Sequence, residues 1–132
     1  MKILLIEDEA LIAMEQRFYL EMDGHEVIGP APTPGQAIEL ALAERPDMAL
    51  VDIHLSHKTS GIDAARRLSM EGIPCLFVTS YPEEVRPNPD LALGCLSKPF
   101  SETTLIAAVH AVQAILAGKT PKVVPKTLEL FH

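Results

Sequence analysis

The sequence has little of what marks several common protein classes. It contains no tryptophan, and its two cysteines, Cys75 and Cys95, each stand in an apolar segment, which predicts buried reduced thiols rather than a disulfide framework or a metal site. Long apolar runs are also missing: the first, from Ile3 to Ile6, stops at the acidic Glu7 and is too short for a signal peptide or a membrane span. We therefore expect a cytoplasmic protein without a membrane segment.

Positive charge is scarce as well. The chain carries 11 Lys and Arg against 18 Asp and Glu, a formal net charge of −7. Because nucleic-acid backbones and anionic lipids are bound through excess basic side chains, this balance disfavours both as partners and favours a protein or a small ligand. The length of 132 residues fits one domain, so we expect a single domain without an attached output domain.

Short apolar runs alternate with segments in which apolar residues recur at helical spacing. The expected strands are 2–6, 25–29, 48–51, 75–78 and 91–96, and the expected helices are 9–22, 36–44, 61–70 and 101–117. Apolar strands separated by helices are typical of parallel sheets buried on both faces, since each crossover covers a face with a helix. The pattern predicts an α/β fold with a doubly wound, five-stranded parallel sheet.

Prolines interrupt this pattern in two places. Segment 81–90, between the last two expected strands, contains three prolines, and proline inside a helix costs about 3 kcal/mol, so any helix there should be short or irregular. Segment 119–132 contains Pro121 and Pro125 and shows no second-domain pattern. We expect residues 1–118 to form the domain and the remainder to be an extended or disordered tail, whose apolar residues near the end could dock on a partner.

Five polar residues stand where expected strands end. Glu7 and Asp8 follow the first strand, Asp52 the third, Thr79 the fourth and Lys98 the fifth, where Pro99 makes the next peptide bond a candidate for cis geometry. The carboxyl ends of parallel strands meet at one edge of a doubly wound sheet, and ligands bind in the crevice outside that edge. We therefore expect these five side chains to form one site.

The chemistry of this set favours phosphoryl transfer to a carboxylate. Three carboxylates in one place repel one another unless a cation neutralises them, and oxygen-only ligands favour Mg²⁺. Asp52 would be a metal ligand together with Glu7 and Asp8, and also the nucleophile that takes the phosphoryl group as an acyl phosphate. The Lys98 ammonium and the Thr79 hydroxyl would neutralise charge on the transferred oxygens.

The same residues carry a resemblance to a known family. Glu7-Asp8 after the first strand, Asp52 after the third, Thr79 after the fourth and Lys98-Pro99-Phe100 after the fifth resemble the receiver domain of two-component response regulators, the CheY-like family, over about residues 1–118. The resemblance implies a flavodoxin-like (βα)5 fold with strand order 2-1-3-4-5, and Mg²⁺-dependent phosphotransfer to Asp52 from a histidine kinase or a histidine phosphotransfer protein. It also implies that His54 offers Mg²⁺ its backbone carbonyl, that Thr79 moves toward the phosphoryl group, and that a downstream protein receives the signal.

Within that family the chain shows a subgroup likeness and some departures. Segment 77–80, Phe-Val-Thr-Ser, resembles the subgroup named for a Phe-Ala-Thr-Gly motif, which includes general-stress-response receivers, with Val78 and Ser80 departing from the motif. Ser56 stands where a proline often follows the phosphorylated residue, and Cys95 where many members carry a Tyr or Phe switch. These departures leave the phosphorylation chemistry intact and put the usual output mechanism in doubt.

Other functions stay open at this point. A flavodoxin-like nucleotide or flavin binder should have a glycine-rich turn after its first strand, where this chain has three acidic residues, 7–9. An aspartyl-phosphate phosphatase-like enzyme usually has a second acid two residues after its nucleophile, the position of His54. A degenerate receiver would act only through protein interaction. The side chains of His54 and His57, three apart in a loop, are expected to be solvated rather than metal-bound. We expect a phosphoacceptor that is not an enzyme.

Overall fold

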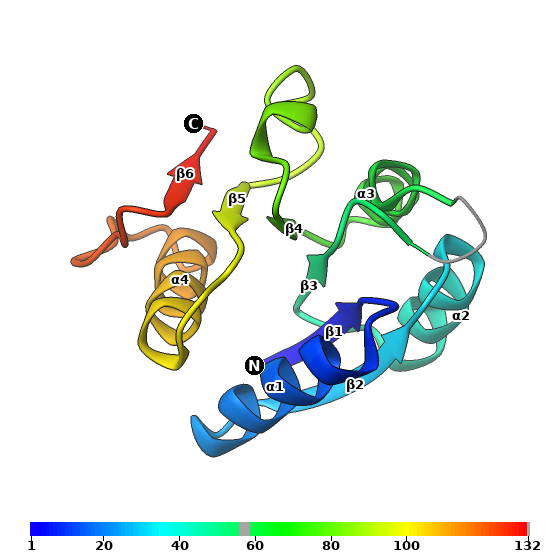
Figure 1. The fold of residues 1–132 in the computed structure, drawn as a ribbon, viewed down its shortest axis with the longest axis horizontal. Helices are drawn as coiled ribbons and strands as arrows, with labels where there is room; N and C mark the ends of the chain where they lie inside the picture. The colour runs from blue at the N-terminus through cyan, green and yellow to red at the C-terminus, as the bar shows by residue number, and fades with distance from the viewer. Residues whose placement is uncertain (56–58, 132) are drawn as a thin grey trace.

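The fold was analysed in a computed structural model that describes residues 1–55 and 59–131 (Figure 1). Its strands are β1 (Lys2–Ile6), β2 (Glu26–Ala31), β3 (Met48–Val51), β4 (Cys75–Thr79), β5 (Gly94–Ser97) and β6 (Leu128–Leu130). Its helices are α1 (Ala10–Met22), α2 (Pro34–Glu44), α3 (Gly61–Met70), the short 3-10 helix η2 (Pro82–Glu84) and α4 (Glu102–Leu116). Ser56 and His57 lie outside the described residues.

The strands form one six-stranded sheet in the order β2-β1-β3-β4-β5-β6. The first five pair in parallel, which confirms the predicted doubly wound sheet and its order 2-1-3-4-5. Successive side chains of a strand face opposite sides of a sheet, so Leu4 and Ile6 pack with the core under α2 and α3, while Ile3 and Leu5 pack with the core under α1 and α4. Figure 1 shows these two helix pairs on opposite faces of the sheet.

Helix ends follow the local sequence. The hydroxyl of Thr33 accepts a hydrogen bond from the Gln36 N–H at 3.3 Å, and Pro34 occupies the first turn of α2. The hydroxyl of Ser101 accepts one from the Thr104 N–H at 3.1 Å at the start of α4. Hydroxyl caps satisfy amides that have no partner inside the helix, so α2 begins at Pro34, two residues before the expected start, and α4 at Glu102, one residue after it.

The connection between β4 and β5 confirms the expected irregular helix, because η2 is a single 3-10 turn. β5 was expected to begin at Leu91, and this start is wrong: the strand begins at Gly94. A turn closed by the Leu91 N–H on the Asn88 carbonyl at 3.2 Å holds the preceding residues out of the strand ladder. Pairing with β4 starts only where the Leu93 N–H bonds the Cys75 carbonyl at 2.8 Å.

The tail contributes a sixth strand that was not predicted. β6 pairs antiparallel with β5, placing Glu129 opposite Cys95 and Leu128 opposite Leu96. Without β6, the edge of β5 would present unpaired backbone groups, and β6 satisfies them while Leu128 is buried in the core. The apolar residues near the end of the tail therefore pack on the chain's own sheet. Gly94 permits this, since a Cβ there would lie 2.3 Å from the Glu129 carbonyl oxygen.

Candidate functional site

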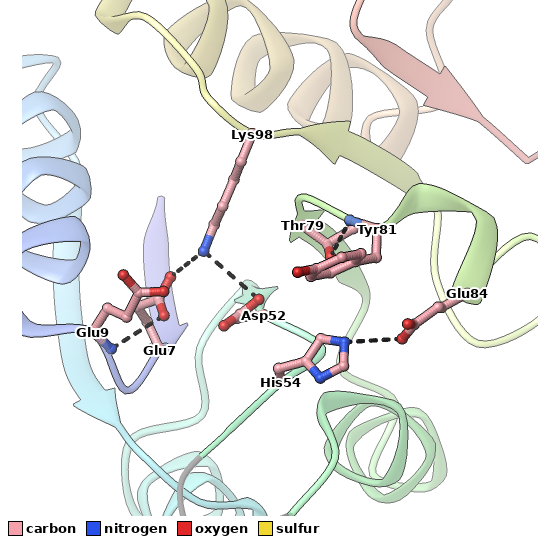
Figure 2. A network of polar contacts seen from close by, with 8 residues as sticks. All are labelled: Glu7, Glu9, Asp52, His54, Thr79, Tyr81, Glu84 and Lys98. Atoms are coloured by element: carbon pink, nitrogen blue, oxygen red, sulfur yellow. Dashed lines mark hydrogen bonds and ion pairs between the residues drawn. The ribbon is translucent and has the colours of Figure 1, made fainter.

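The structure brings the polar residues at the strand ends together (Figure 2). The Lys98 ammonium nitrogen lies 2.7 Å from Glu7 Oε1 and 3.6 Å from Asp52 Oδ1. One carboxylate oxygen from each of Glu7, Asp8 and Asp52 lies within 4.8 Å of the others. The site therefore has three carboxylates and one ammonium at a single edge of the sheet, from segments that follow β1, β3 and β5.

Backbone hydrogen bonds hold these side chains in register. The Asp52 N–H donates to the Ile6 carbonyl at 2.9 Å, which ties the end of β3 to the end of β1. The Lys98 N–H donates to the Thr79 carbonyl at 2.8 Å, which ties the start of the following loop to β4. The Lys98–Pro99 bond is cis, as hypothesised from the sequence. The Lys98 side chain is 9% exposed and crosses from the end of β5 toward β1.

Burial dominates the electrostatics of the site. Glu7 is 3% exposed and Asp52 is 7% exposed. Loss of water raises the pKa of the Glu7 carboxyl; the hydrogen bond from Lys98 acts against this rise, and the nearby Asp52 charge adds to it. Burial likewise raises the pKa of the Asp52 carboxyl, which the Lys98 charge opposes and the Asp8 charge supports. One ammonium therefore does not offset the cost of gathering these carboxylates.

Thr79 lies at the end of β4 and is fully buried. Its hydroxyl oxygen accepts a hydrogen bond from the Tyr81 N–H at 3.0 Å. Figure 2 shows the hydroxyl beside that amide, on the side of the site where the chain turns toward η2. The Thr79 hydroxyl therefore links the acidic site to the segment that joins β4 and β5.

The His54 side chain points to that same connection. Its Nε2 lies 3.0 Å from Glu84 Oε2, and its ring packs edge-on against the Tyr81 ring at a centroid distance of 5.0 Å. The side chain is 59% exposed, so it is a solvated loop histidine with two specific neighbours. The contact between His54 and Glu84 could not be predicted from the sequence, because residues 30 positions apart show no periodic pattern.

The backbone on both sides of His54 is fixed by the first residue of α3 and by Thr59 just before the helix. The Gly61 N–H donates to the Ile53 carbonyl at 2.7 Å, and the Leu55 N–H donates to the Thr59 carbonyl at 3.2 Å. A Cβ on Gly61 would lie 1.7 Å from the Asp52 carbonyl oxygen, so only glycine allows α3 to begin this close to Asp52. This glycine was read from the sequence only as a helix start.

The two cysteines lie outside the acidic site. Cys75 and Cys95 are free and buried, as predicted. Burial raises the pKa of the Cys75 thiol to about 12 and that of the Cys95 thiol to about 11. Within the described residues, α1 to α4 are each too short or too polar to cross a bilayer as a helix.

Comparison with known proteins places this geometry in a family. Residues 3–110 match the model of the response regulator receiver domain. The phyllosphere-induced regulator PhyR of Methylorubrum extorquens is 39% identical over 114 residues, covering 82% of this chain and 42% of PhyR. The solution structure of the receiver domain of Erythrobacter litoralis PhyR has a TM-score of 0.78 and 34% identity, covering 93% of this chain and 95% of that one.

A variant of PhyR from Bartonella quintana, described as an anti-anti-sigma factor, has a TM-score of 0.67 and 37% identity, covering 76% of this chain and 43% of that one. The chain spans about half the length of the curated relatives it matches. The similarity to PhyR is consistent with a receiver of the general-stress-response type, the subgroup that segment 77–80 resembles. The family model, the fold and the relatives together show that the chain belongs to the response regulator receiver family.

Proposed function

We propose that Asp52 is the phosphoacceptor of this receiver and that it takes the phosphoryl group from a histidine kinase or a histidine phosphotransfer protein. The observation that carries the proposal is the meeting of Asp52 with two further carboxylates within 4.8 Å and with the Lys98 ammonium at 3.6 Å. A buried carboxylate with a raised pKa, surrounded by acidic neighbours, is costly in a site that serves only structure.

The donor set of the site fits Mg²⁺. Glu7, Asp8 and Asp52 offer carboxylate oxygens within reach of one ion, and Mg²⁺ prefers oxygen ligands and keeps several waters. We assign these three side chains and the backbone carbonyl of His54 as the protein ligands. The hydrogen bonds donated by the Leu55 and Gly61 amides go to the carbonyls of Thr59 and Ile53, so neither uses the His54 carbonyl. When bound, Mg²⁺ would neutralise charge on the phosphoryl oxygens.

Asp52 and Lys98 carry out the rest of the proposed reaction. An Asp52 carboxylate oxygen attacks the phosphorus and forms an O–P bond, while the P–N bond to the donor imidazole breaks and its electron pair stays on nitrogen, which takes up a proton from water. Lys98 then leaves its 2.7 Å contact with Glu7 to neutralise a phosphoryl oxygen, a short movement because it already lies beside Asp52. This is self-catalysed acceptance of a phosphoryl group rather than turnover of a substrate.

The downstream partner is proposed to be a protein. The net charge of −7 disfavours nucleic acid, and the Bartonella relative is described as an anti-anti-sigma factor. An anti-sigma factor from the source organism is accordingly the first candidate to test by pull-down with and without phosphorylation of Asp52.

The acceptor assignment is tested by intact-mass measurement after incubation with acetyl phosphate. We expect one phosphoryl adduct on the wild-type protein with Mg²⁺ and little adduct when EDTA is present. Asp52→Asn should remove the adduct, whereas the matched control Asp63→Asn, an exposed carboxylate paired with Arg67, should keep it. An equal adduct on Asp52→Asn would place the acceptor elsewhere. Steady release of phosphate from a phosphomonoester would favour the phosphatase, and a wild-type protein that never takes an adduct would favour an interaction-only receiver.

A further inference from the structure

A second cluster of ligand-type side chains lies away from the acidic site. Asp23 ends α1, His25 precedes β2, and His110 lies within α4. The Nε2 atoms of both imidazoles meet the same carboxylate oxygen: Asp23 Oδ2 lies 3.0 Å from His25 and 2.7 Å from His110. We propose that these three residues form a binding site for a divalent transition metal of the Zn²⁺ type.

The three side chains are held in place before any metal arrives. Asp23 and His25 flank a tight turn in which Gly24 has φ of 90° and the His25 N–H bonds the Leu20 carbonyl at 3.0 Å. The His25 side chain is 5% exposed, and its Nδ1 lies 3.0 Å from the amino nitrogen of Met1. This contact orients the ring, and for Nε2 to bind a metal the proton of His25 must lie on Nδ1, where the Met1 amino group accepts it in its neutral form.

The geometry is close to that of a coordinated ion. Two imidazole nitrogens and one carboxylate oxygen are a common donor set for Zn²⁺, and ligand atoms on one tetrahedral ion lie about 3.3 Å apart when bonds are about 2.0–2.1 Å. The observed separations of 3.0 and 2.7 Å are shorter than this by about 0.3 and 0.6 Å, and all three ligand atoms lie within 4.8 Å of one another. Small side-chain shifts would therefore admit the ion.

A fourth coordination position is available on the solvent side. Asp23 and His110 line a cleft of about 790 Å³ between α1, α4 and the segment around Lys122, with Tyr19 and Ile106 as neighbours. Water or an external ligand can enter from this cleft, which matches sites with three protein ligands and one exchangeable position. The alternative is that both imidazole N–H groups simply donate to Asp23 and join α1 to α4 without a metal.

Titration of the tag-free protein with Zn²⁺, in excess Mg²⁺ to occupy the acidic cluster, separates these two outcomes. We expect one Zn²⁺ per chain, and Co²⁺ should give the visible absorption of a tetrahedral site. His110→Ala, an exposed position, should lower Zn²⁺ affinity by more than the roughly 10- to 100-fold that loss of an outer-shell contact costs. Asp23→Asn, which keeps the side-chain shape, should weaken binding in the same direction.

Two control variants make the result specific. His54→Ala removes another exposed histidine that contacts a single carboxylate at 3.0 Å, and Asp52→Asn disrupts the acidic cluster. Both should bind Zn²⁺ within about twofold of wild type. Wild-type protein without stoichiometric binding, an unchanged affinity in His110→Ala, or a loss confined to Asp52→Asn would each overturn the proposal. None of these results bears on phosphorylation, so the two proposals fail independently.

Discussion

Replacing Asp52 by Asn should make the protein more stable when Mg²⁺ is absent, although it removes a charge from an ion pair. At an effective permittivity of about 20, unit charges 4.8 Å apart interact by about 3.5 kcal/mol and charges 3.6 Å apart by about 4.6 kcal/mol. Burial is the largest cause that raises the pKa of Asp52, which is also repelled by Glu7 and Asp8, with ligand atoms within 4.8 Å, and attracted by Lys98 at 3.6 Å. Burial adds the cost of taking the Asp52 charge out of water, and the pKa of its carboxyl is raised despite Lys98, so the attraction does not offset burial and repulsion together.

Solvent reduces this difference because Asp8 is exposed and its charge is screened. We therefore expect Asp52→Asn to raise the free energy of unfolding in EDTA at neutral pH by about 1–3 kcal/mol. Urea unfolding monitored by circular dichroism measures it, with Asp63→Asn as a control that should change by at most about 0.5 kcal/mol, since its ion pair with Arg67 is exposed. Mg²⁺ should stabilise the wild type and have little effect on Asp52→Asn.

The pH dependence gives a second readout of the same cause. The folded state raises the pKa of the Glu7 and Asp52 carboxyls, so it binds their protons more tightly than the unfolded state does. Without Mg²⁺, stability from these groups is fully present below their ordinary pKa values of 4.5 and 3.8 and is lost as pH rises through the higher folded values. Asp52→Asn should weaken this dependence. A variant less stable than wild type in EDTA would refute the reasoning, because it would mean that the attraction to Lys98 dominates.

Three further outcomes are expected. Lys98→Ala should leave Mg²⁺ affinity roughly intact, measured by titration, while weakening the conformational response to phosphorylation, since we propose that Lys98 contacts the phosphoryl group rather than the metal; loss of Mg²⁺ binding with a normal response would contradict this role. With beryllofluoride as phosphoryl mimic, hydrogen exchange should change in segment 79–92, and Thr79→Ala should suppress that change. Unchanged exchange in this segment together with changed exchange in α1 or α4 would contradict this expectation. Maleimide should label Cys75 and Cys95 far more slowly in native protein than in urea, because a thiol pKa of about 11 or 12 leaves little thiolate; equal rates would show exposed thiols.

The central sheet and the position of the site could be predicted because both follow from one rule. Strands buried on both faces are apolar throughout, as in β3 and β4, and their carboxyl ends meet at one edge. A polar residue directly after such a strand, Asp52 for example, is therefore placed in space by its position in the sequence. The same logic places Lys98, although the partner it contacts most closely, Glu7, depends on side-chain geometry.

Other features depend on neighbours that a linear pattern does not reveal. β6 is three residues long, too short for a periodic signal, and forms because β5 offers an unpaired edge. Asp23, His25 and His110 are joined by a contact across 87 residues between the end of α1 and α4. The start of α3 close to Asp52 rests on the absence of a side chain at Gly61, which sequence alone marks only as a turn or a helix start.

The contacts around Thr79 suggest how a receiver without an aromatic switch at position 95 can transmit its state. Cys95 is buried and paired with Glu129 of β6, so it cannot swing between two positions as a tyrosine would. If the Thr79 hydroxyl turns to a phosphoryl oxygen, it gives up the Tyr81 N–H, a neutral hydrogen bond with a net worth of about 1 kcal/mol, for a charge-assisted one of about 1.5–3 kcal/mol. The exchange is favourable, and it releases the Tyr81 amide. The Tyr81 ring packs on His54, and His54 contacts Glu84 in η2. Because this chain of contacts is exposed and η2 is a single turn, a small gain at the site is sufficient to shift the population of the whole connection.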